Sequence, residues 1–334
     1  MENETLRNTS KDIDVHVSVV IPFYNAQAYI ADCCNALFMQ SLKNIEYIFV
    51  DDGSTDSSRR VINEILERYP HRIHRAKFVV HPENRGVVAA RRSGVMSAIG
   101  EYIIHCDADD RPEPQMYERL WKKAKEQDAD IVSCDIVEHC SHIEKPAGEI
   151  PTCDSPQIYL QCLLHARKPK IRCWLWNKLI RGSLYRDVTW PDGVEMAEDM
   201  IILSQIVPRA GRIAHVNSLL YHYNIREGSL SRQEITREYI EKHLRTVHAL
   251  REALCCDADD AKRKLFTTVA PFFLQPLLEI RQRYCGNSEF RRRFSEFRRG
   301  IWRSTTLSPK NKLLLWLATY NYTFAHLLKR IVLR

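Results

Sequence analysis

The sequence lacks the features that mark several large protein classes. Its 11 cysteines form no C-x-x-C pair, and their scattered positions fit a reducing compartment better than a zinc site or a disulfide framework. Segment 1–14 is polar and acidic without an apolar stretch, so we expect it to be disordered and not to act as a secretory signal. No run approaches the roughly 20 apolar residues that a membrane-spanning helix needs.

A net positive charge is absent outside the C-terminal part of the chain. Residues 287–334 carry 11 Lys and Arg against 2 Asp and Glu, a net charge of +9, while the whole chain carries +7 and the rest therefore −2. The net positive charge therefore belongs to residues 287–334, which indicates an anionic partner for this region.

Strands and helices are predicted to alternate over the first 140 residues. Apolar, β-branched runs predict buried strands at 17–23, 45–50, 77–80, 102–106 and 130–137. Helices are predicted between them, at 26–40, 55–69, 84–99 (capped by Asn84) and 114–127. This order predicts an α/β fold with a mostly parallel sheet flanked by helices. We further expect helices at 172–181 and 197–207, an extended segment at 212–223, a domain boundary near 232 and a helical C-terminal region from 234 onward.

The four letters Asp-Ala-Asp-Asp occur twice, at 107–110 and 257–260. The first copy follows a predicted strand, so its carboxylates emerge at the sheet edge where ligands bind in such folds. Mg²⁺ and Mn²⁺ prefer such oxygen ligands and share them with a substrate phosphate. The second copy lies among helix formers and precedes Lys262 and Lys264, so we expect helix-start charges there.

Several motifs follow one another in an order that resembles family 2 glycosyltransferases of the GT-A fold, in particular the bacterial surface-polysaccharide type. They are VSVVIPFYN, VDDGSTD, NRGVVAARRSG, EYIIHCDADD, WNKLIR, AEDMIIL and YHYNIREGSLS. The resemblance covers roughly residues 15–232. It implies a GT-A (Rossmann-like) domain over 15–232 and leaves a helical region over 233–334.

The resemblance implies roles for individual residues of the donor and metal sites. Pro22 and Tyr24 match the segment that frames the nucleotide base, and Asp52 matches the residue that binds the uracil edge. The other donor-side residues implied are Gly86 and Arg91 beside the nucleotide, Asp107 and Asp109 as the D-x-D pair, and Arg226 and Ser229 in a basic loop near the diphosphate. Asp109 is expected to be the more direct metal ligand.

The resemblance also implies residues on the acceptor side of the reaction. Asp199 matches the catalytic base, with Glu198 beside it. His222 is a candidate third metal ligand, although a structural role fits it as well. The segment Trp176, Asn177 and Lys178 is expected to border the acceptor, with packing of the tryptophans as the alternative.

The chemistry of sugar transfer explains why these residue types are required. A divalent metal, Mn²⁺ or Mg²⁺, stabilises the charge that builds on the leaving diphosphate. A carboxylate takes the proton of the attacking acceptor hydroxyl, and one such base gives a single displacement with inversion. We therefore expect metal-dependent transfer from a nucleoside-diphosphate sugar, with UDP favoured by Asp52, to a glycan or polyprenyl-linked acceptor. No Q-x-x-R-W signature is present, so one sugar per event is expected.

Three other functions explain parts of the sequence. VDDGST resembles the phosphatase signature of haloacid dehalogenases, but Val50 stands where their nucleophilic Asp is required. A nucleotidyltransferase would be expected to have a Gly-rich loop after the first strand, where this chain has PFYNAQAY. A non-catalytic, membrane-bound nucleotide-sugar-binding module would be expected to lack the base or the metal ligands.

The uncharged segment 313–328 is flanked by Lys310, Lys312, Lys329, Arg330 and Arg334. It suits a helix that lies at an anionic membrane interface, with Trp316, Tyr320 and Tyr322 at headgroup depth. The alternative is a core helix that closes the C-terminal region. We expect a cytoplasmic protein, peripheral on the inner face of the cytoplasmic membrane, with no nucleic-acid partner.

Overall fold

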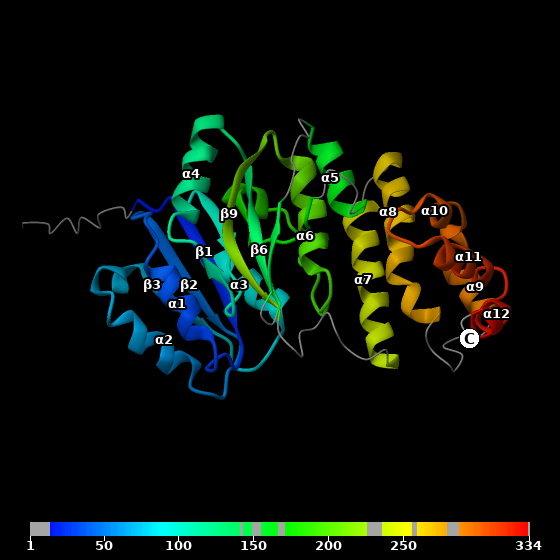
Figure 1. The fold of residues 1–334 in the computed structure, drawn as a ribbon, viewed down its shortest axis with the longest axis horizontal. Helices are drawn as coiled ribbons and strands as arrows, with labels where there is room; N and C mark the ends of the chain where they lie inside the picture. Colours follow the sequence, from blue (N-terminus) through cyan, green and yellow to red (C-terminus); the bar gives the residue numbers. More distant parts are fainter. Residues whose placement is uncertain are drawn as a thin grey trace, which may run out of the picture.

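The computed structural model describes residues 14–140, 143–148, 155–165, 171–225, 236–255, 259–278 and 287–332. In these ranges the chain forms a nine-stranded mixed sheet and, at the opposite end of the molecule, a group of helices (Figure 1). The strands are β1 (Val17–Phe23), β2 (Ile45–Asp51), β3 (Ala76–Val80), β4 (Tyr102–His105), β5 (Arg111–Pro112), β6 (Ile131–Cys140), β7 (Ile143–Ala147), β8 (Lys178–Arg181) and β9 (Ile213–Ile225).

The α-helices of the described residues fall into two groups. Those that accompany the sheet are α1 (Ile30–Phe38), α2 (Ser58–Leu66), α3 (Val87–Ser97), α4 (Met116–Gln127), α5 (Pro156–His165) and α6 (Glu198–Ile206). Those of the C-terminal region are α7 (Arg237–Cys255), α8 (Asp260–Phe273), α9 (Asn287–Phe294), α10 (Arg298–Arg303), α11 (Pro309–Ala318) and α12 (Tyr322–Val332). The predicted domain boundary near residue 232 lies outside the described residues.

The strand order is β3-β2-β1-β4-β8-β6-β9-β5, with β7 paired to β6. The strands β3, β2, β1 and β4 are parallel, as is the pair β6–β9. Antiparallel pairing joins β8 to β4 and β6, β5 to β9, and β7 to β6. The predicted α/β class is confirmed, and the sheet is more mixed than expected. Because β1, β2 and β4 are parallel, the segments that follow them meet at one edge.

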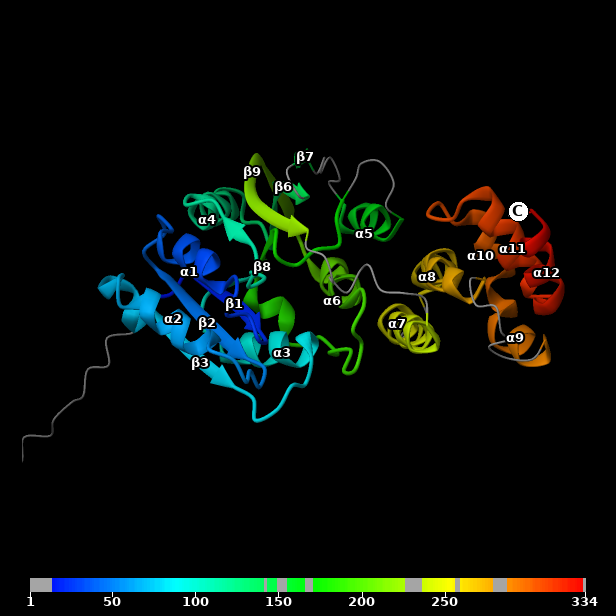
Figure 2. The same cartoon turned by 60° about the horizontal axis from the view of Figure 1, so that its bottom comes forward.

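Alternate side chains of the parallel strands point to opposite faces of the sheet. Val17, Val19 and Ile21 of β1 pack in a core with residues of α1, α2 and α4. Val20 of β1 lies in a second core with residues of α3, α5 and α6. Figure 2 shows α1 and α4 on one side of the sheet and α3 on the other. This burial on both faces explains why these strands are uniformly apolar in the sequence.

The segment 172–181 is not the helix that its composition predicts. Its end forms β8, which pairs antiparallel with both β4 and β6 and so links the two halves of the sheet. The ring of Trp176 stacks on that of Tyr221 from β9, with centroids 4.3 Å apart. Backbone pairing and aromatic stacking to distant strands outweigh the weak local helix preference here.

The starts of α3 and α8 can be compared with the sequence prediction. Helix α3 begins at Val87 with Gly86 as its N-cap, and the Asn84 side chain accepts a hydrogen bond from the Gly86 N–H at 3.1 Å. In the second Asp-Ala-Asp-Asp copy, Asp259 caps α8 and Asp260 pairs with Lys264 at 2.9 Å. The second copy therefore serves helix α8, as expected; Asp257 lies outside the described residues.

The C-terminal helices share an apolar core with the sheet domain. Ile202 of α6, Leu250 of α7 and Phe266 of α8 belong to one buried cluster. The segment 313–328 forms parts of two helices, α11 and α12, and not one continuous helix. Of the helices in the described ranges, none has the length and apolar character needed to span a membrane.

Gly94 tests the packing of α3 on the sheet. A Cβ at this position would collide with Cγ1 of Val20 and press on Val50, both buried strand residues. Overpacking of this kind costs about 1–3 kcal/mol, so we expect Gly94→Ala to lower the free energy of unfolding by that amount. Met96→Ala, on the exposed side of the same helix, should change it by less than about 0.5 kcal/mol. Equal effects in urea denaturation would contradict this packing.

Candidate active site

Arg91 brings together carboxylates from distant parts of the chain. It lies on α3, is 3% exposed, and donates from Nη2 to Oδ1 of Asp107 at 3.0 Å and from Nη1 to Oδ1 of Asp199 at 3.2 Å. The carboxylate of Glu198 lies 3.9 Å from the same Nη1. The segment after β4 and the first turn of α6 thus meet at one guanidinium. The sequence prediction placed Arg91 beside the nucleotide and missed this bridge.

The two acidic residues at the start of α6 occupy a buried site. Oδ2 of Asp199 accepts the backbone N–H of Leu175 at 3.1 Å, which fixes the carboxylate from the side opposite Arg91. Burial raises the pKa of the Asp199 carboxyl, although Arg91 opposes the shift. Burial and the neighbouring Asp199 charge raise the pKa of Glu198 to about 7. This pair can exchange a proton near neutral pH, as a general base requires.

The three acidic residues of the first Asp-Ala-Asp-Asp copy have different surroundings. The side chain of Asp107 is 29% exposed, whereas Asp110 is fully buried. Asp110 accepts hydrogen bonds from the Tyr221 hydroxyl at 2.9 Å and from the Asn224 N–H at 2.8 Å. Burial, with the charges of Asp107 and Asp109, raises the pKa of Asp110 well above its ordinary value. Asp110 thus anchors to β9 the turn that carries Asp107 and Asp109.

Asp107 and Asp109 fit a divalent metal by the chemistry of their oxygens and by position. Both lie in the turn that follows β4, and neither is fully buried. Among the described residues no three His, Cys, Asp or Glu side chains form a complete metal-binding group. Mg²⁺ and Mn²⁺ sites of nucleotide enzymes are commonly completed by substrate phosphates and water, so two carboxylates meet the requirement.

His222 has its ring nitrogens committed to other side chains. Nε2 lies 2.5 Å from Oε1 of Glu113, and Nδ1 lies 2.8 Å from Nε2 of His139. These contacts join β9 to β6 and to the segment after β5. These contacts agree with the structural role that the sequence allowed for His222. To bind a metal ion, His222 would first have to break one of them.

Asp52 organises the loop that leads into α3. Its carboxylate, 3% exposed, accepts the N–H of Arg85 at 3.0 Å and that of Gly86 at 2.8 Å, and it lies 2.6 Å from Nδ1 of His81. Gly86 adopts a φ of +87°, a conformation that favours glycine. The carboxylate thus holds residues 84–86 in the shape from which α3 starts.

Pro22 and Tyr24 lie where β1 ends. Pro22 is buried within β1, and the Tyr24 ring after it is 45% exposed. The next residue, Asn25, accepts the Thr55 N–H at 2.9 Å, which ties the loops after β1 and β2 together. Tyr24 is therefore an exposed aromatic ring at the sheet edge that also carries Asp52. Arg226 and Ser229 lie outside the described residues.

The predicted acceptor segment does not reach the surface. Trp176 is 2% exposed, and Asn177 and Lys178 are fully buried. The Asn177 amide donates to the Cys134 carbonyl at 2.9 Å, and Nζ of Lys178 donates to the Arg172 carbonyl at 2.7 Å. These side chains are used inside the fold, which disfavours direct contact with an acceptor, and the acceptor assignment of the three residues stays a prediction. Trp176 packs against Tyr221 in the core, which is the alternative role that the sequence allowed for it.

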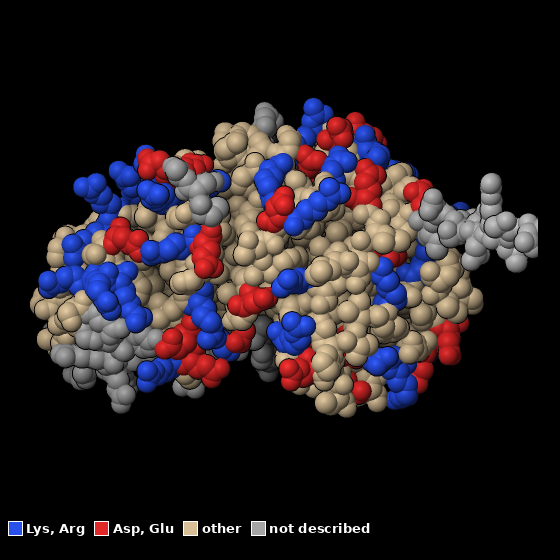
Figure 3. Space-filling view, turned by 180° about the vertical axis from the view of Figure 1, so that it is seen from behind, with Lys and Arg blue, Asp and Glu red and all other residues tan. Residues whose placement is uncertain are grey.

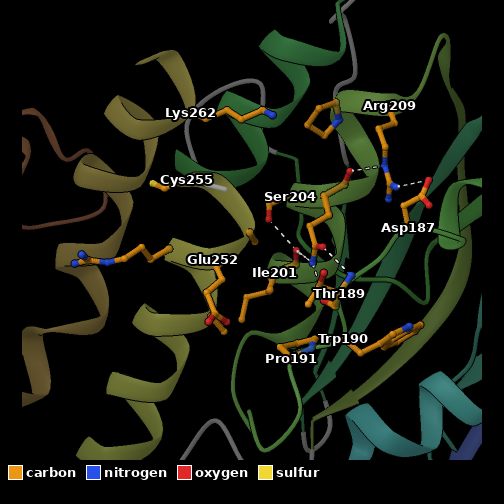
Figure 4. A pocket seen from close by; sticks show the side chains of 15 residues that line it. Asp187, Thr189, Trp190, Pro191, Ile201, Ser204, Arg209, Glu252, Cys255 and Lys262 are labelled. Carbon is orange, nitrogen blue, oxygen red and sulfur yellow. Dashed lines mark hydrogen bonds and ion pairs between the residues drawn. The ribbon is translucent and has the colours of Figure 1, made fainter. Parts of the chain in front are cut away.

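One sizeable cavity of the described residues lies away from the acidic cluster. It has a volume of about 740 Å³ and runs between α6 and the helices α7 and α8 (Figure 4). Ile201 and Ser204 face it from α6, and Glu252 and Lys262 face it from the C-terminal helices. None of the predicted site residues lines it, so its size alone does not identify it as the active site.

A smaller, mainly apolar pocket lies between α5, α6 and the C-terminal helix α8. Its volume is about 370 Å³, and it is lined by residues of α5, the 171–174 segment, α6, α8 and the turn before α11. Met200, next to Asp199, and Cys173 and Trp174, next to Leu175, contribute to its wall. Asp199 and Glu198 are not among the described residues that line this pocket.

The sequence has clear relatives. Residues 18–169 match the profile of glycosyl transferase family 2. A cholesterol galactosyltransferase of Borreliella burgdorferi is 30% identical over 266 residues, which cover 75% of this chain and 72% of that relative. The chain belongs to glycosyl transferase family 2. Glycosyltransferase GlyA of Streptococcus pneumoniae, also 30% identical, matches 66% of this family 2 chain, which spans only 32% of GlyA.

Solved structures extend the likeness to the C-terminal helices. Residues 1–349 of S. aureus TarS, in complex with UDP-GlcNAc, match with a TM-score of 0.67 at 18% identity, covering 95% of this chain and 92% of that one. The mannosyltransferase PcManGT of Pyrobaculum calidifontis, in complex with GDP-Man and Mn²⁺, matches with a TM-score of 0.53 at 15% identity, covering 95% and 87%. The likeness confirms the GT-A fold predicted for this family 2 chain.

Two neighbouring arginines test the bridge at Arg91. Removing one partner of a buried ion pair leaves uncompensated charge, so Arg91→Ala should lower the free energy of unfolding at pH 8 by about 3–5 kcal/mol. Arg92 is the matched control, because its exposed side chain pairs with Asp192 only at 3.5 Å. Arg92→Ala should cost no more than about 1 kcal/mol. Similar losses for both variants in chemical denaturation would show that Arg91 does not bridge the carboxylates.

Proposed function

We propose that this chain is a metal-dependent, inverting glycosyltransferase. It would transfer a sugar from a nucleoside-diphosphate sugar, with UDP preferred, to a hydroxyl of a glycan or lipid-linked acceptor in the synthesis of a surface polysaccharide. The observation that carries the proposal is the contact of Arg91 with both Asp107 and Asp199. This contact places a candidate phosphate-and-metal residue next to a candidate base, as a single displacement between donor and acceptor requires.

On the donor side, the loops after β1, β2 and β3 would receive the nucleotide. The exposed Tyr24 ring and Pro22 would frame the base, and residues 84–86 would border it. Since His81, Arg85 and Gly86 already use most of the lone pairs of Asp52, we assign it first to the shape of this loop and second to a direct uracil contact. TarS in complex with UDP-GlcNAc supports a UDP-sugar. Arg226 and Ser229 remain proposed diphosphate contacts.

Asp107 and Asp109 would hold Mn²⁺ or Mg²⁺, which when bound supplies Lewis-acid stabilisation of the leaving diphosphate. PcManGT in complex with Mn²⁺ and a nucleotide sugar supports a divalent ion. Arg91 would keep Asp107 oriented and add a fixed positive charge beside the diphosphate. Asp110 would keep the turn in place through Tyr221 and Asn224.

Asp199 would accept the proton of the acceptor hydroxyl, with Glu198 able to share it. The Leu175 N–H and Arg91 orient the Asp199 carboxylate, and burial keeps water away from it. With one base facing the leaving group, the nucleophile is the acceptor itself, and the anomeric configuration inverts. A second carboxylate nucleophile is not required.

The apolar pocket beside Met200 and Trp174 replaces the segment 176–178 as the proposed acceptor side. Its residues from α5, α6 and α8 offer contact to an apolar group and few hydrogen bonds. A lipid-linked acceptor would place its sugar near Asp199 and its apolar part in this pocket. The relative named as a cholesterol galactosyltransferase supports an acceptor with apolar character.

Release of UDP from a panel of UDP-sugars tests the proposed reaction without knowledge of the acceptor. We expect release from one sugar with Mn²⁺ or Mg²⁺, none with EDTA, and a loss of about 10²–10⁴-fold in Asp199→Ala. Asp109→Ala should abolish the metal response. Asp260→Ala, in the exposed second Asp-Ala-Asp-Asp copy, is the matched control and should behave like the unmodified protein.

Other outcomes of this experiment separate the alternative functions. Metal-dependent UDP binding without release would support a strict acceptor requirement or a non-catalytic binding module. Absence of UDP binding would contradict the donor assignment. Release that is unaffected by both Asp109→Ala and Asp199→Ala would contradict the catalytic assignment.

The pH dependence of turnover tests the buried acidic pair. Because the pKa of Glu198 is raised to about 7 and that of Asp199 is raised as well, the pair loses its proton only near neutrality. We expect kcat/KM to fall as the pH drops below about 7, because the base is then protonated. In Glu198→Gln this fall in kcat/KM should occur at lower pH. The general-base role of this pair would be contradicted if kcat/KM fell at the same pH in Glu198→Gln. It would also be contradicted if activity were constant between pH 5 and 8.

We also propose a cytoplasmic location with peripheral contact to the inner face of the cytoplasmic membrane through the C-terminal region. The net charge of this region and the exposed apolar side chains of α11 and α12 support this contact.

A further inference from the structure

The C-terminal helices contain a cavity of unusual composition. Its volume is about 500 Å³, and the lining residues are all polar or basic: Asn287, Ser288, Arg291, Arg292, Ser295 and Arg298. Three guanidinium groups and three small polar side chains thus surround one space, formed by α9, the turn after it and the first residue of α10. Guanidinium groups arranged in this way match the oxygens of a phosphate.

Among the described side chains, no carboxylate compensates the positive charge of this cavity. Arg298 donates to the Thr319 hydroxyl at 3.0 Å and to the Thr319 carbonyl at 2.8 Å, and Arg291 donates to the Tyr320 carbonyl at 3.2 Å. In the described part of the chain, none of the three arginines of the cavity forms an ion pair with a carboxylate. Glu296, the nearby acidic residue of the turn, pairs with Arg251 of α7. Neutral oxygen atoms therefore orient Arg291 and Arg298 and leave their charge available to an anion.

An aromatic row starts at the edge of this cavity. The Arg298 guanidinium lies 4.0 Å from the centroid of the Tyr320 ring. The Tyr320 ring is 5.0 Å from that of Trp316, which is 6.0 Å from that of Trp302. Trp302 and Tyr320 are about half exposed. The row continues the arginine cavity along the surface of α10 and α11.

Exposed apolar side chains of α12 lie on the same helical hairpin. Phe324 and Leu327 of α12 are 51% and 54% exposed, and their spacing of three residues places them on one face of that helix. Tyr320 lies in the turn between α11 and α12. Figure 3 shows Lys and Arg side chains gathered at the end of the molecule that carries the C-terminal helices. Phosphate-binding groups and exposed apolar groups therefore occur side by side in this region.

We propose that the cavity of Arg291, Arg292 and Arg298 binds the phosphate of an anionic phospholipid while Trp302, Tyr320, Phe324 and Leu327 enter the outer part of the bilayer. This inference deepens the proposed membrane contact of the C-terminal region. An anionic bilayer presents phosphates directly above an apolar layer, and Trp and Tyr rings lie at the boundary between them. A nucleic acid would match the arginines but would leave the apolar side chains in water.

Binding of the full-length protein to vesicles, in the absence of any sugar donor, tests this inference. Vesicles that contain phosphatidylglycerol should bind the protein, and vesicles of phosphatidylcholine alone should bind it far more weakly. Arg291→Gln/Arg292→Gln removes two charges and should lower the partition coefficient about thirtyfold. Phe324→Ser/Leu327→Ser should also weaken binding, and this loss should persist at high salt because it is apolar.

The matched control removes two charges from the far side of the protein. Lys43 and Arg68 are exposed residues of the sheet domain, so Lys43→Gln/Arg68→Gln changes the net charge equally and should leave vesicle binding within about twofold. All variants should keep the melting temperature and UDP binding of the unmodified protein. Retained UDP release with lost vesicle binding would separate this docking surface from the proposed transfer reaction.

Three results would each overturn the inference, the second and third by removing the lipid phosphate as the ligand. One is equal loss of vesicle binding in the control and in Arg291→Gln/Arg292→Gln, which would make the attraction a property of net charge alone. The second is equal binding to phosphatidylcholine vesicles, and the third is binding to single-stranded RNA as tight as to anionic vesicles.

Discussion

The buried guanidinium of Arg91 is the interaction on which the organisation of this site depends. It joins α3, the turn after β4 and the first turn of α6, three elements that are far apart in the sequence. Without it, Asp107, Glu198 and Asp199 would repel one another inside the protein. Burial on its own would lower the pKa of Arg91, but the carboxylates of Asp199, Asp107 and Glu198 outweigh burial and raise it. The arginine therefore stays charged and keeps these acidic groups close together.

Two further carboxylates fix the frame around this contact. Asp52 accepts backbone N–H groups of residues 85 and 86, so it determines how the chain enters α3, the helix that carries Arg91. Asp110 is held by Tyr221 and Asn224 of β9, so it determines how Asp107 and Asp109 are presented after β4. Asp52 and Asp110 thus shape the loops, while Asp107, Asp109 and Asp199 are the carboxylates proposed to meet the metal and the substrates. This division allows the site to be formed before any substrate arrives.

Sequence patterns predicted those parts of the molecule that local chemistry determines. Apolar, β-branched runs identified β1, β2 and β4, and the position of each Asp-Ala-Asp-Asp copy relative to a strand or helix separated the site from the helix cap. The segment 172–181 could not be predicted, because β8 forms only by pairing with β4 and β6. The burial of Trp176 depends in the same way on Tyr221, and the bridge at Arg91 depends on a contact across 108 residues. The order YHYN supplies both Tyr221 and Asn224 and was the available signal for the anchoring of Asp110.

A double-mutant cycle in unfolding free energy tests most directly whether Arg91 couples the two carboxylates. The cycle combines Arg91→Met with Asp199→Asn and, separately, with Asp107→Asn, and it needs no enzymatic activity. Residues in direct contact within one ion-pair network are coupled by about 0.5–3 kcal/mol, and we predict a coupling of at least about 1 kcal/mol in both cycles. Additive effects within about 0.3 kcal/mol in either cycle would show that Arg91 does not hold that carboxylate, and would contradict this account of the site.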